Sequence, residues 1–598
     1  MAKKQKLRSE IEEKYKWDLS PIYSGNEDWY KDLEIVSKEV EEVLNYKGKL
    51  LISAKSLLEY LEFSIKLERR LYKLYYFAQL NFDSDTTNNE YQQMSGKIQN
   101  LLSKYNELDS FADPELMKAD YDIIKNFYIE EPALKQYEFV LEQIYRYKEH
   151  ILTEEQERIL SAFANINDIP EETFEALTDS DLKFGIIKDE EGNEVELTES
   201  NYSNFIESED RTVREAAFNQ LLGTYSNYKN TIAKTFAGNV EVLTTLSKLK
   251  HFNSSLEASL FGDNIDRKVY DNLIETVSSG LDTLYKYFDL KKDVLGLSEF
   301  HLYDQYNSLV PDCDKNYSFE EAKKIVLEAL SILGEDYIEI LNKAFDERWI
   351  DVYNNKGKRT GAYSSGFYDT NPYLLLNYEG KFGDISTLAH ELGHSVHTYY
   401  SCHNNPYQYS HYRIFVAEVA STVNELLLKL YMLNKSCDKN EKKYIINVMM
   451  NSFKSTIYRQ VMFAEFERDV HALKEKGEIL TNELLSNYYY ELNKKYFGPN
   501  VVVDDAIRYE WARIPHFYYN FYVYKYAIGL SCACYIVDNI LAGKENALED
   551  YKRFLKAGGS DYPANELEIA GIDITNSEVI SSAIKMFDNL IEQFKSLD

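Results

Sequence analysis

Long stretches of this 598-residue chain repeat apolar residues at three- and four-residue spacing, with charged residues between them. The stretches Ser56–Phe77 and Glu320–Leu333 are clear examples. Such spacing places the apolar side chains on one face of an α-helix. Only 10 prolines and 24 glycines, the residues that most often break helices, interrupt the chain. The pattern therefore predicts a mainly α-helical protein, a bundle of many helices joined by short connections.

A turn-rich segment near residue 200 breaks this helical pattern. In Leu182–Tyr202, two short apolar runs flank a turn around Gly192. Two apolar runs on either side of such a turn predict a β-hairpin. Strong helical periodicity returns after it. We therefore predict a helical N-terminal domain over residues 1–200 that ends in the hairpin, and a second domain over residues 201–598.

A second break covers Glu347–Gly380, which is rich in glycine, serine, asparagine and tyrosine and contains the apolar run Tyr373–Leu376 near its end. Short strands and loops fit this composition better than a helix does. The segment lies just upstream of the histidine motif described below. We therefore expect a small β-sheet there, with an edge strand that faces the motif.

The charge balance excludes some classes of partner. The chain carries 99 acidic and 67 basic residues, for a formal net charge of −32. An acidic surface repels phosphate backbones and anionic lipids, so we expect neither nucleic acid nor membrane partners. The basic N-terminus is not followed by an apolar run of the kind found in signal peptides, and no stretch of eighteen apolar residues occurs. The expected location is the cytoplasm.

The sequence TLAHELGHSVH, Thr387–His397, contains two histidines four residues apart, with a glutamate directly after the first. Residues four apart share a helix face, so the imidazoles of His390 and His394 can converge on one metal ion. Glu391 lies on the adjoining edge, where it can reach a water molecule without binding the metal. The pattern predicts a zinc site with a general base. A helix with ordinary core or surface histidines is the less favoured interpretation.

A catalytic zinc ion needs a third protein ligand, and two residues qualify. His397 lies on roughly the same face as His390 and His394, but one straight helix would have to wrap three ligands around the ion. Glu418 lies on the next helical stretch, which is mostly apolar. A buried carboxylate there is costly unless it is paired or binds a metal. We therefore favour Glu418 as the ligand and expect His397 beside the site or facing substrate.

Glu425 lies seven residues after Glu418, nearly eclipsed with it on a helix. It is suited to accept a hydrogen bond from a ligand imidazole, although an ordinary helix glutamate would show the same pattern. His403 and His411 also lie near the motif in sequence, and a position on a surface loop fits them equally well.

The sequence RIPHFYYNFYVYKYAIG, Arg513–Gly529, combines a histidine with several tyrosines. A hydrolase must stabilise an oxyanion, and imidazole and phenol groups are suitable donors. The chain contains 51 tyrosines, however, so ordinary core packing explains this density equally well. Only proximity to the metal would favour the donor interpretation, and spacing does not show proximity.

These motifs together resemble a known family. HELGHSVH, then FVAEVASTVNE, then RIPHFYYNFYVYKYAIG look like oligoendopeptidase F of the thimet oligopeptidase superfamily. KYKWDLSPIY, the predicted hairpin and GAYSSGFYDTNPYLLLNY also match that pattern, so the resemblance covers essentially the whole chain. It implies a mainly α-helical fold with a thermolysin-like catalytic core in residues 201–598, a small β-sheet beside the site, and a deep channel that admits short, unfolded peptides.

The resemblance also implies roles for individual residues. It assigns one zinc ion per chain to His390, His394 and Glu418, and the general base to Glu391. It makes His516 and tyrosines of the Tyr522–Tyr526 stretch transition-state donors, with Tyr524 and Tyr526 the best placed. The implied substrate-binding residues are Tyr522 and a segment that would offer backbone groups to an extended peptide: Gly361, Ala362, Tyr363 and Ser364.

The predicted function is a zinc-dependent endopeptidase that hydrolyses internal bonds of short oligopeptides. Zinc would lower the pKa of a water molecule, and Glu391 would take its proton and pass it to the leaving amine. One alternative, a metallocarboxypeptidase of related fold, needs a basic group at the closed end of the channel, for which the sequence offers no clear candidate. The other is a non-catalytic helical peptide-binding scaffold, against which the intact Glu391 argues. The expected partners are short unfolded peptides, and no oligomeric state is assigned.

Overall fold

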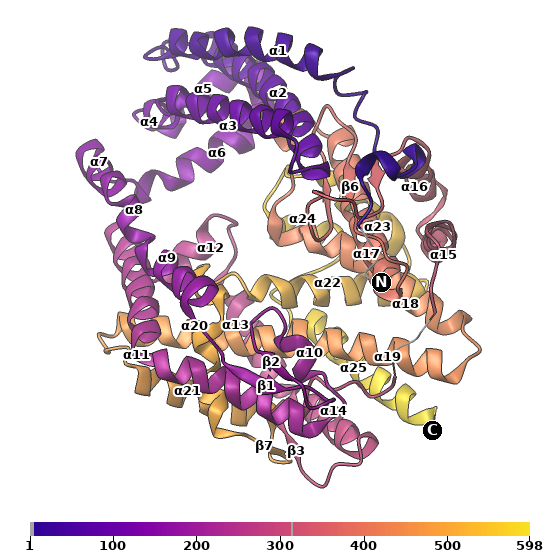
Figure 1. The fold of residues 1–598 in the computed structure, drawn as a ribbon. Helices are drawn as coiled ribbons and strands as arrows, with labels where there is room; N and C mark the ends of the chain where they lie inside the picture. Colours follow the sequence, from indigo (N-terminus) through magenta and orange to yellow (C-terminus); the bar gives the residue numbers. More distant parts are fainter. Residues whose placement is uncertain (1–4, 312–314, 598) are drawn as a thin grey trace. The chain divides into compact units, whose positions relative to one another are not determined.

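Helices dominate the computed structural model, which describes residues 5–311 and 315–597 (Figure 1). This confirms the predicted mainly α-helical, multi-helix fold. The chain forms two compact units, each assembled from three separate segments. Unit 1 contains Met1–Lys148, Lys315–Tyr431 and Asn539–Gly571. Unit 2 contains the remaining segments, Glu149–Asp314, Met432–Asp538 and Ile572–Asp598.

The predicted domain boundary near residue 200 stays a prediction. Residue 200 lies inside one segment of unit 2, and the chain passes between the units at other points. Each unit is therefore completed by residues that are far apart in sequence. The hairpin that marked the predicted boundary is present, since strands β1 (Ile186–Lys188) and β2 (Glu194–Glu196) pair antiparallel.

Unit 1 contains the N-terminal helices and the helix that carries the histidine motif. Its helices are α1 (Asn26–Glu39), α2 (Ala54–Ser84), α3 (Asn89–Asp109), α4 (Ala112–Leu116), α5 (Tyr121–Glu130), α6 (Glu138–Arg146), α15 (Phe319–Leu330), α16 (Glu335–Asp346), α17 (Phe382–Asn404), α18 (Ile414–Lys435, whose last turn passes into unit 2), α23 (Ala547–Ala557) and α24 (Pro563–Ile569).

Unit 2 is built around the long helix α11, which packs against α20 and α21. No helix in the two described ranges is long and apolar enough to cross a bilayer. The helices of unit 2 are α7 (Glu154–Ala162), α8 (Ala164–Asn167), α9 (Ile169–Glu175), α10 (Tyr202–Ile206), α11 (Arg211–Leu249), α12 (Ser255–Phe261), α13 (Arg267–Ser279), α14 (Leu281–Val294), α19 (Lys439–Phe453), α20 (Gln460–Glu475), α21 (Asn482–Phe497), α22 (Tyr524–Leu541, whose end passes into unit 1) and α25 (Ser577–Ser596).

The described strands form three small sheets. Besides the hairpin, β3 (Phe300–His301) pairs in parallel with β7 (Val501–Val502) in unit 2. In unit 1, β4 (Ile350–Asp351), β6 (Tyr373–Leu375) and β5 (Tyr363–Ser365) form a sheet in the order β4-β6-β5. In that sheet, β6 pairs in parallel with β4 and antiparallel with β5, with Ser364 opposite Leu374. The segment predicted as short strands and loops is therefore confirmed, and β5 is one of the two edge strands of the sheet.

Short polar side chains begin two of the longest helices. The side chain of Ser53 accepts the Ser56 N–H at the start of α2, and that of Asp210 accepts the Thr212 N–H at the start of α11. Such N-caps satisfy donors that have no partner within the helix. The amphipathic pattern supplies the apolar face, and the caps set where each helix begins.

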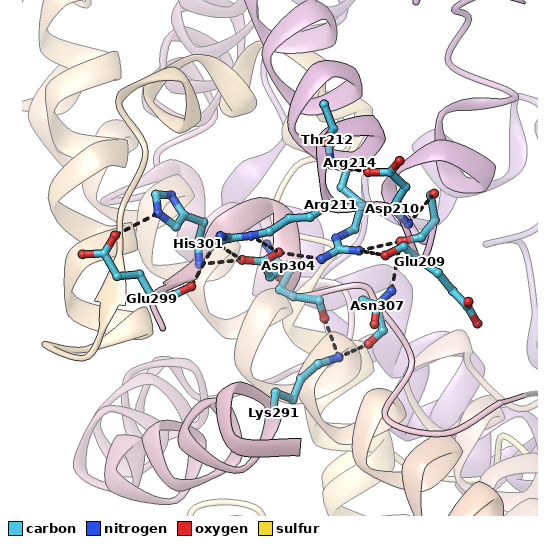
Figure 2. A network of polar contacts seen from close by, with 12 residues as sticks. Glu209, Asp210, Arg211, Thr212, Arg214, Lys291, Glu299, His301, Asp304 and Asn307 are labelled. Carbon is cyan, nitrogen blue, oxygen red and sulfur yellow. Dashed lines mark hydrogen bonds and ion pairs between the residues drawn. The ribbon is translucent and has the colours of Figure 1, made fainter. Parts of the chain in front are cut away.

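A buried carboxylate fastens the first turn of α11 inside unit 2 (Figure 2). Asp304 is fully buried and accepts hydrogen bonds from Arg211 at 2.9 and 3.2 Å and from Arg214 at 2.9 Å. Arg214 also donates to the Ser208 carbonyl at 2.6 Å. Nearby, Lys291 donates to the carbonyls of Gln305 and Asn307. The network thus joins α11 and α14 to the loop that follows β3.

Replacing Asp304 by Asn is expected to destabilise the protein by about 3–5 kcal/mol, because the buried Arg214 would lose its counter-charge. Urea unfolding followed by circular dichroism measures the change. The matched control is Glu12→Gln, which breaks an exposed pair with Lys14 and should leave the free energy of unfolding nearly unchanged. Equal effects of the two substitutions would contradict a structural role for the buried pair.

Candidate metal centre

Helices α17 and α18 carry the residues of the predicted metal site. The side chain of Asp384 accepts the backbone N–H groups of Lys381 at 2.8 Å and Glu379 at 3.1 Å, which fastens the loop before α17 onto its first turn. Further along α17, His390 and His394 lie one turn apart. Their imidazole rings face each other edge to face at a centroid distance of 5.0 Å.

Glu418 on α18 completes a three-ligand cluster. Its Oε2 atom lies 3.4 Å from His390 Nε2 and 3.8 Å from His394 Nε2. The candidate ligand atoms of His390, His394 and Glu418 all lie within 4.8 Å of one another. Two imidazoles and one carboxylate are a donor set that suits zinc, and three protein ligands leave a further position open. The residues therefore fit a catalytic metal site.

Glu425 lies behind the first histidine. Its Oε2 atom is 3.3 Å from His390 Nδ1, so the imidazole can present Nε2 to a metal. Ser386 donates to Glu425 at 3.1 Å, and Lys429 donates to the same carboxylate. No sequence pattern pointed to these two contacts of Glu425, although Ser386 lies one helical turn from His390 and Lys429 one turn from Glu425. On the second histidine, the Ala417 carbonyl accepts a hydrogen bond from His394.

The pKa values of the cluster residues favour a protonated His390 beside an ionised Glu418. Burial opposes the charged form of His390, but hydrogen bonds with Glu418 and Glu425 outweigh it and raise its pKa to about 10. Burial and the charge of His390 lower the pKa of His394 to about 4. Burial would raise the pKa of Glu418, but its hydrogen bond with His390 and the charges of both histidines lower it to about 2. A metal ion that binds here must displace the proton from His390.

Glu391 contacts the edge strand rather than the ligand cluster. The Ser364 backbone N–H donates a hydrogen bond to its carboxylate, and burial raises the pKa of Glu391 to about 7. The Ser364 and Ser395 hydroxyls hydrogen bond at 2.8 Å, which further joins β5 to α17. The predicted base therefore lies on α17 beside the ligand residues and contacts the strand predicted to bind substrate.

Gly393 allows α17 and α18 to approach closely. A Cβ atom at this position would lie 2.6 Å from Ser421 Cα and 2.7 Å from the Ala420 carbonyl oxygen. Backbone atoms cannot move aside as a flexible side chain can, so no larger residue fits without separating the helices. Gly393 was not among the predicted site residues. A glycine inside a helix lowers the stability of that helix by about 1 kcal/mol relative to alanine, so its presence there suggests that packing requires it.

Two pockets flank the edge strand within unit 1. A pocket of about 510 Å³ lies between α2 and β5, and three predicted substrate-binding residues line it: Ala362, Tyr363 and Ser364. The Tyr363 hydroxyl donates to the buried Asp83 of α2 at 2.7 Å. A second pocket of about 260 Å³ is lined by Gly361 and Ala362 together with residues of α17. The predicted substrate-binding segment thus borders open space, and its residue Ser364 also contacts Glu391.

His397 lies in the core of unit 1 and not among the ligands. It is 1% exposed, and its ring stacks on Tyr412 at a centroid distance of 3.6 Å. Burial lowers its pKa to about 3, so the imidazole is neutral. His411 stacks on Phe367, and the Nδ1 atom of the exposed His403 lies 2.8 Å from the Tyr399 carbonyl oxygen. The structure thus brings Glu418, and not His397, together with His390 and His394.

The predicted donors lie in unit 2. The rings of Tyr522 and Tyr526 meet edge to face at 5.3 Å, and the ring of His516 lies 6.1 Å from that of Tyr526. Tyr524 is 1% exposed, and its ring packs on Tyr270 at 5.0 Å. His516, Tyr522 and Tyr526 therefore form a cluster, and Tyr524 belongs to the core. The role of these residues as donors to the reaction stays a prediction.

Replacing Glu425 by Gln is expected to weaken zinc binding by about 10–100-fold, because the charge that supports His390 is lost while the side-chain shape is kept. Competition with a chromogenic chelator measures the affinity. The control is Glu339→Gln on α16, which makes the same change at an exposed position. A zinc affinity equal to that of the control would show that Glu425 does not support the ligand.

Two family models match the chain. One is described as Peptidase family M3 and matches residues 204–586, and one is described as Oligopeptidase F and matches residues 115–184. The chain is 43% identical over 590 residues to Oligopeptidase PepF of Bacillus subtilis (strain 168), which covers 99% of this chain and 88% of that protein. The resemblance identified from the motifs is confirmed.

Solved structures show the same fold. A crystal structure of a Chlamydophila abortus protein matches with a TM-score of 0.95 and 37% identity, covering 100% of both chains. The crystal structure of oligoendopeptidase-F from Enterococcus faecium matches with a TM-score of 0.74 and 34% identity, covering 96% of this chain and 99% of that one.

Proposed function

The chain belongs to peptidase family M3, a family of metallopeptidases, and from that premise we propose that it is a zinc-dependent endopeptidase acting on short, unfolded peptides. The observation that carries the proposal is the convergence of His390, His394 and Glu418 beside Glu391. A structural metal site is usually closed by four protein ligands, whereas three ligands next to a carboxylate are typical of a hydrolytic site.

His390, His394 and Glu418 would hold the zinc ion. When bound, zinc would act as a Lewis acid that lowers the pKa of water and polarises a peptide carbonyl. Glu425 and the Ala417 carbonyl engage the other ring nitrogens of the two histidines and so fix which nitrogen of each is free for the metal.

Glu391 is proposed to move the proton. It would take a proton from the attacking water and then deliver it to the amine that leaves. The hydrogen bond from the Ser364 N–H orients this carboxylate, and its buried position keeps it poorly hydrated. An elevated pKa makes a carboxylate a better base and lets its protonated form serve as an acid.

The substrate is proposed to bind in extended form along β5. This strand is the edge of its sheet, and an edge strand offers unpaired backbone groups to an added strand. Gly361, Ala362, Tyr363 and Ser364 border the two pockets that would receive side chains. An added strand must have backbone groups that are not already paired, as in an unfolded peptide, which supports unfolded oligopeptides as the substrate class. Tyr522 is proposed to contact the bound peptide.

His516 and Tyr526 are proposed to donate hydrogen bonds to the oxyanion that forms during attack. Burial lowers the pKa of His516, so the neutral imidazole, which is still a donor through one nitrogen, prevails at neutral pH. Tyr526 is favoured over Tyr524 because its ring belongs to the His516 cluster while that of Tyr524 packs in the core.

The decisive experiment is digestion of a mixed peptide library, with cut sites mapped by mass spectrometry. We expect internal cuts, near-equal cleavage of matched peptides with free and amidated C-termini, zinc near one ion per chain, and loss of cleavage with a chelator. Strict dependence on a free C-terminus would instead identify a metallocarboxypeptidase. Absence of any cleavage by zinc-loaded protein would favour a peptide-binding scaffold.

A further inference from the structure

The segment His516–Tyr526, called the donor segment below, contains a turn in a costly backbone conformation. Asn520 and Phe521 have φ angles of 50° and 58°, in the left-handed region. Residues other than glycine adopt this region rarely, and two in succession persist only when the surroundings hold them there. Tyr522 follows the turn directly, and α22 begins two residues later at Tyr524.

A buried acid on α20 holds this turn. Glu467 is 0% exposed, and its Oε1 atom accepts the Phe521 N–H at 2.6 Å. Its Oε2 atom has no hydrogen-bond partner among the described residues. Burial raises the pKa of Glu467 to about 8, so the carboxyl group is largely protonated and uncharged at neutral pH. This group therefore bonds the strained turn and little else.

Further contacts within unit 2 fix the same turn. The Ser259 hydroxyl donates to the Asn520 carbonyl at 2.9 Å. The Phe521 ring is buried between Tyr270, at a centroid distance of 5.9 Å, and His471, at 4.6 Å. Three helices, α12, α13 and α20, thus hold two residues of the chain.

Burying a carboxyl group contributes little to the stability of a folded protein. An apolar side chain of similar volume would avoid the cost of desolvating the acid. Strained backbone and incompletely paired buried polar groups cluster where a site must be held in one geometry. Here the held turn leads into Tyr522 and Tyr526, whose rings meet beside His516.

We infer that Glu467 is a positioning residue: it fixes the Asn520–Phe521 turn and so sets the orientation of Tyr522 and Tyr526 relative to His516. The inference rests on the proposed donor role of this segment. Because Glu467 acts through the turn and touches no substrate, its loss should impair the chemical step more than the binding of peptide, to which Tyr522 is proposed to contribute.

The test compares three variants of the full-length, zinc-loaded protein. Glu467→Leu removes the acceptor and should lower kcat at least about tenfold with a smaller change in KM, since small misplacements of catalytic groups have large effects on rate. Glu467→Gln keeps a neutral acceptor for the Phe521 N–H and should retain kcat within about threefold, because it preserves the hydrogen bond that sets this geometry. Glu566→Leu is the matched control. Glu566 is 1% exposed and likewise has Oε2 unpaired among the described residues, but it lies on α24 in unit 1.

The control should lose thermal stability without the selective loss of kcat. Equal kcat values for Glu467→Leu and Glu566→Leu, or a Glu467→Gln variant as impaired as Glu467→Leu, would overturn the inference. If Glu467→Leu does not fold, Ser259→Ala carries the test, since it removes the other hydrogen bond to the turn. A kcat that falls by a larger factor than KM rises then supports the inference, and an unchanged kcat overturns it.

His516→Ala, measured in the same assay, separates this inference from the proposed function. Unchanged kcat in His516→Ala would refute the donor role itself and the inference that rests on it. A large loss in His516→Ala together with wild-type kcat in Glu467→Leu would overturn the positioning role alone.

Discussion

Replacing Glu391 by Gln is expected to lower kcat by about 10²–10⁴-fold or more while zinc stays bound. The amide cannot take a proton from water, but its carbonyl oxygen can still accept the Ser364 N–H. The side chain therefore keeps its place beside β5. His390, His394 and Glu418 are unchanged, so the metal content should remain near one zinc ion per chain.

Turnover of an internally quenched peptide and zinc content by atomic absorption measure this result. Glu379→Gln is the matched control, because it removes one negative charge from an exposed residue just before α17 and should leave kcat unchanged. Wild-type turnover by the Glu391 variant would eliminate the proposed base. Loss of zinc would instead show that Glu391 contributes to metal binding.

Gly393→Ala is expected to disrupt the metal centre although it adds a single methyl group. The added Cβ would lie 2.6 Å from Ser421 Cα, so α17 and α18 must separate by several tenths of an ångström or more. His390 and His394 would then move relative to Glu418. A misplacement approaching 1 Å can cost about 10²-fold in rate, and overpacking costs about 1–3 kcal/mol of stability. Zinc affinity should fall together with kcat/KM.

The control for this prediction lies on the same helix. An alanine at position 383 would meet nothing within 4 Å, so Gly383→Ala should stabilise α17 slightly through helix propensity and leave zinc binding intact. Chelator competition, peptide turnover and urea unfolding are measured on both variants. If the two behave alike, close contact between the helices is not what brings Glu418 to the histidines.

The metal centre was predictable because its geometry is local. A spacing of four residues places His390 and His394 on one helix face wherever the helix packs. Glu418 was predictable because a carboxylate on an apolar helix requires a partner. By contrast, the hydrogen bond from Ser364 to Glu391 joins a strand to a helix, and no local pattern specifies it. The strand order β4-β6-β5 depends on tertiary packing in the same way.

The tyrosines of the donor segment show a different limit. Every second residue from Tyr522 to Tyr526 is a tyrosine, so composition does not distinguish them. The rings of Tyr522 and Tyr526 contact each other, whereas the side chain of Tyr524 is buried in the core. These directions depend on the residue at which α22 begins. That start follows the turn at Asn520–Phe521, and neither residue type signals a left-handed conformation strongly enough to predict it.

The discontinuous make-up of unit 1 affects how the protein folds while it is being synthesised. Helix α17 packs against α23, His397 lies 5.5 Å from Phe554 between ring centroids, and the Gly559 N–H donates to the Tyr409 carbonyl at 2.9 Å. A growing chain emerges N-terminus first, so both histidine ligands leave the ribosome long before α23 does. Until then the back of the metal-binding helix is exposed to solvent. The histidine motif therefore acquires its final surroundings, and with them its capacity to hold an ion firmly, only when synthesis is nearly complete.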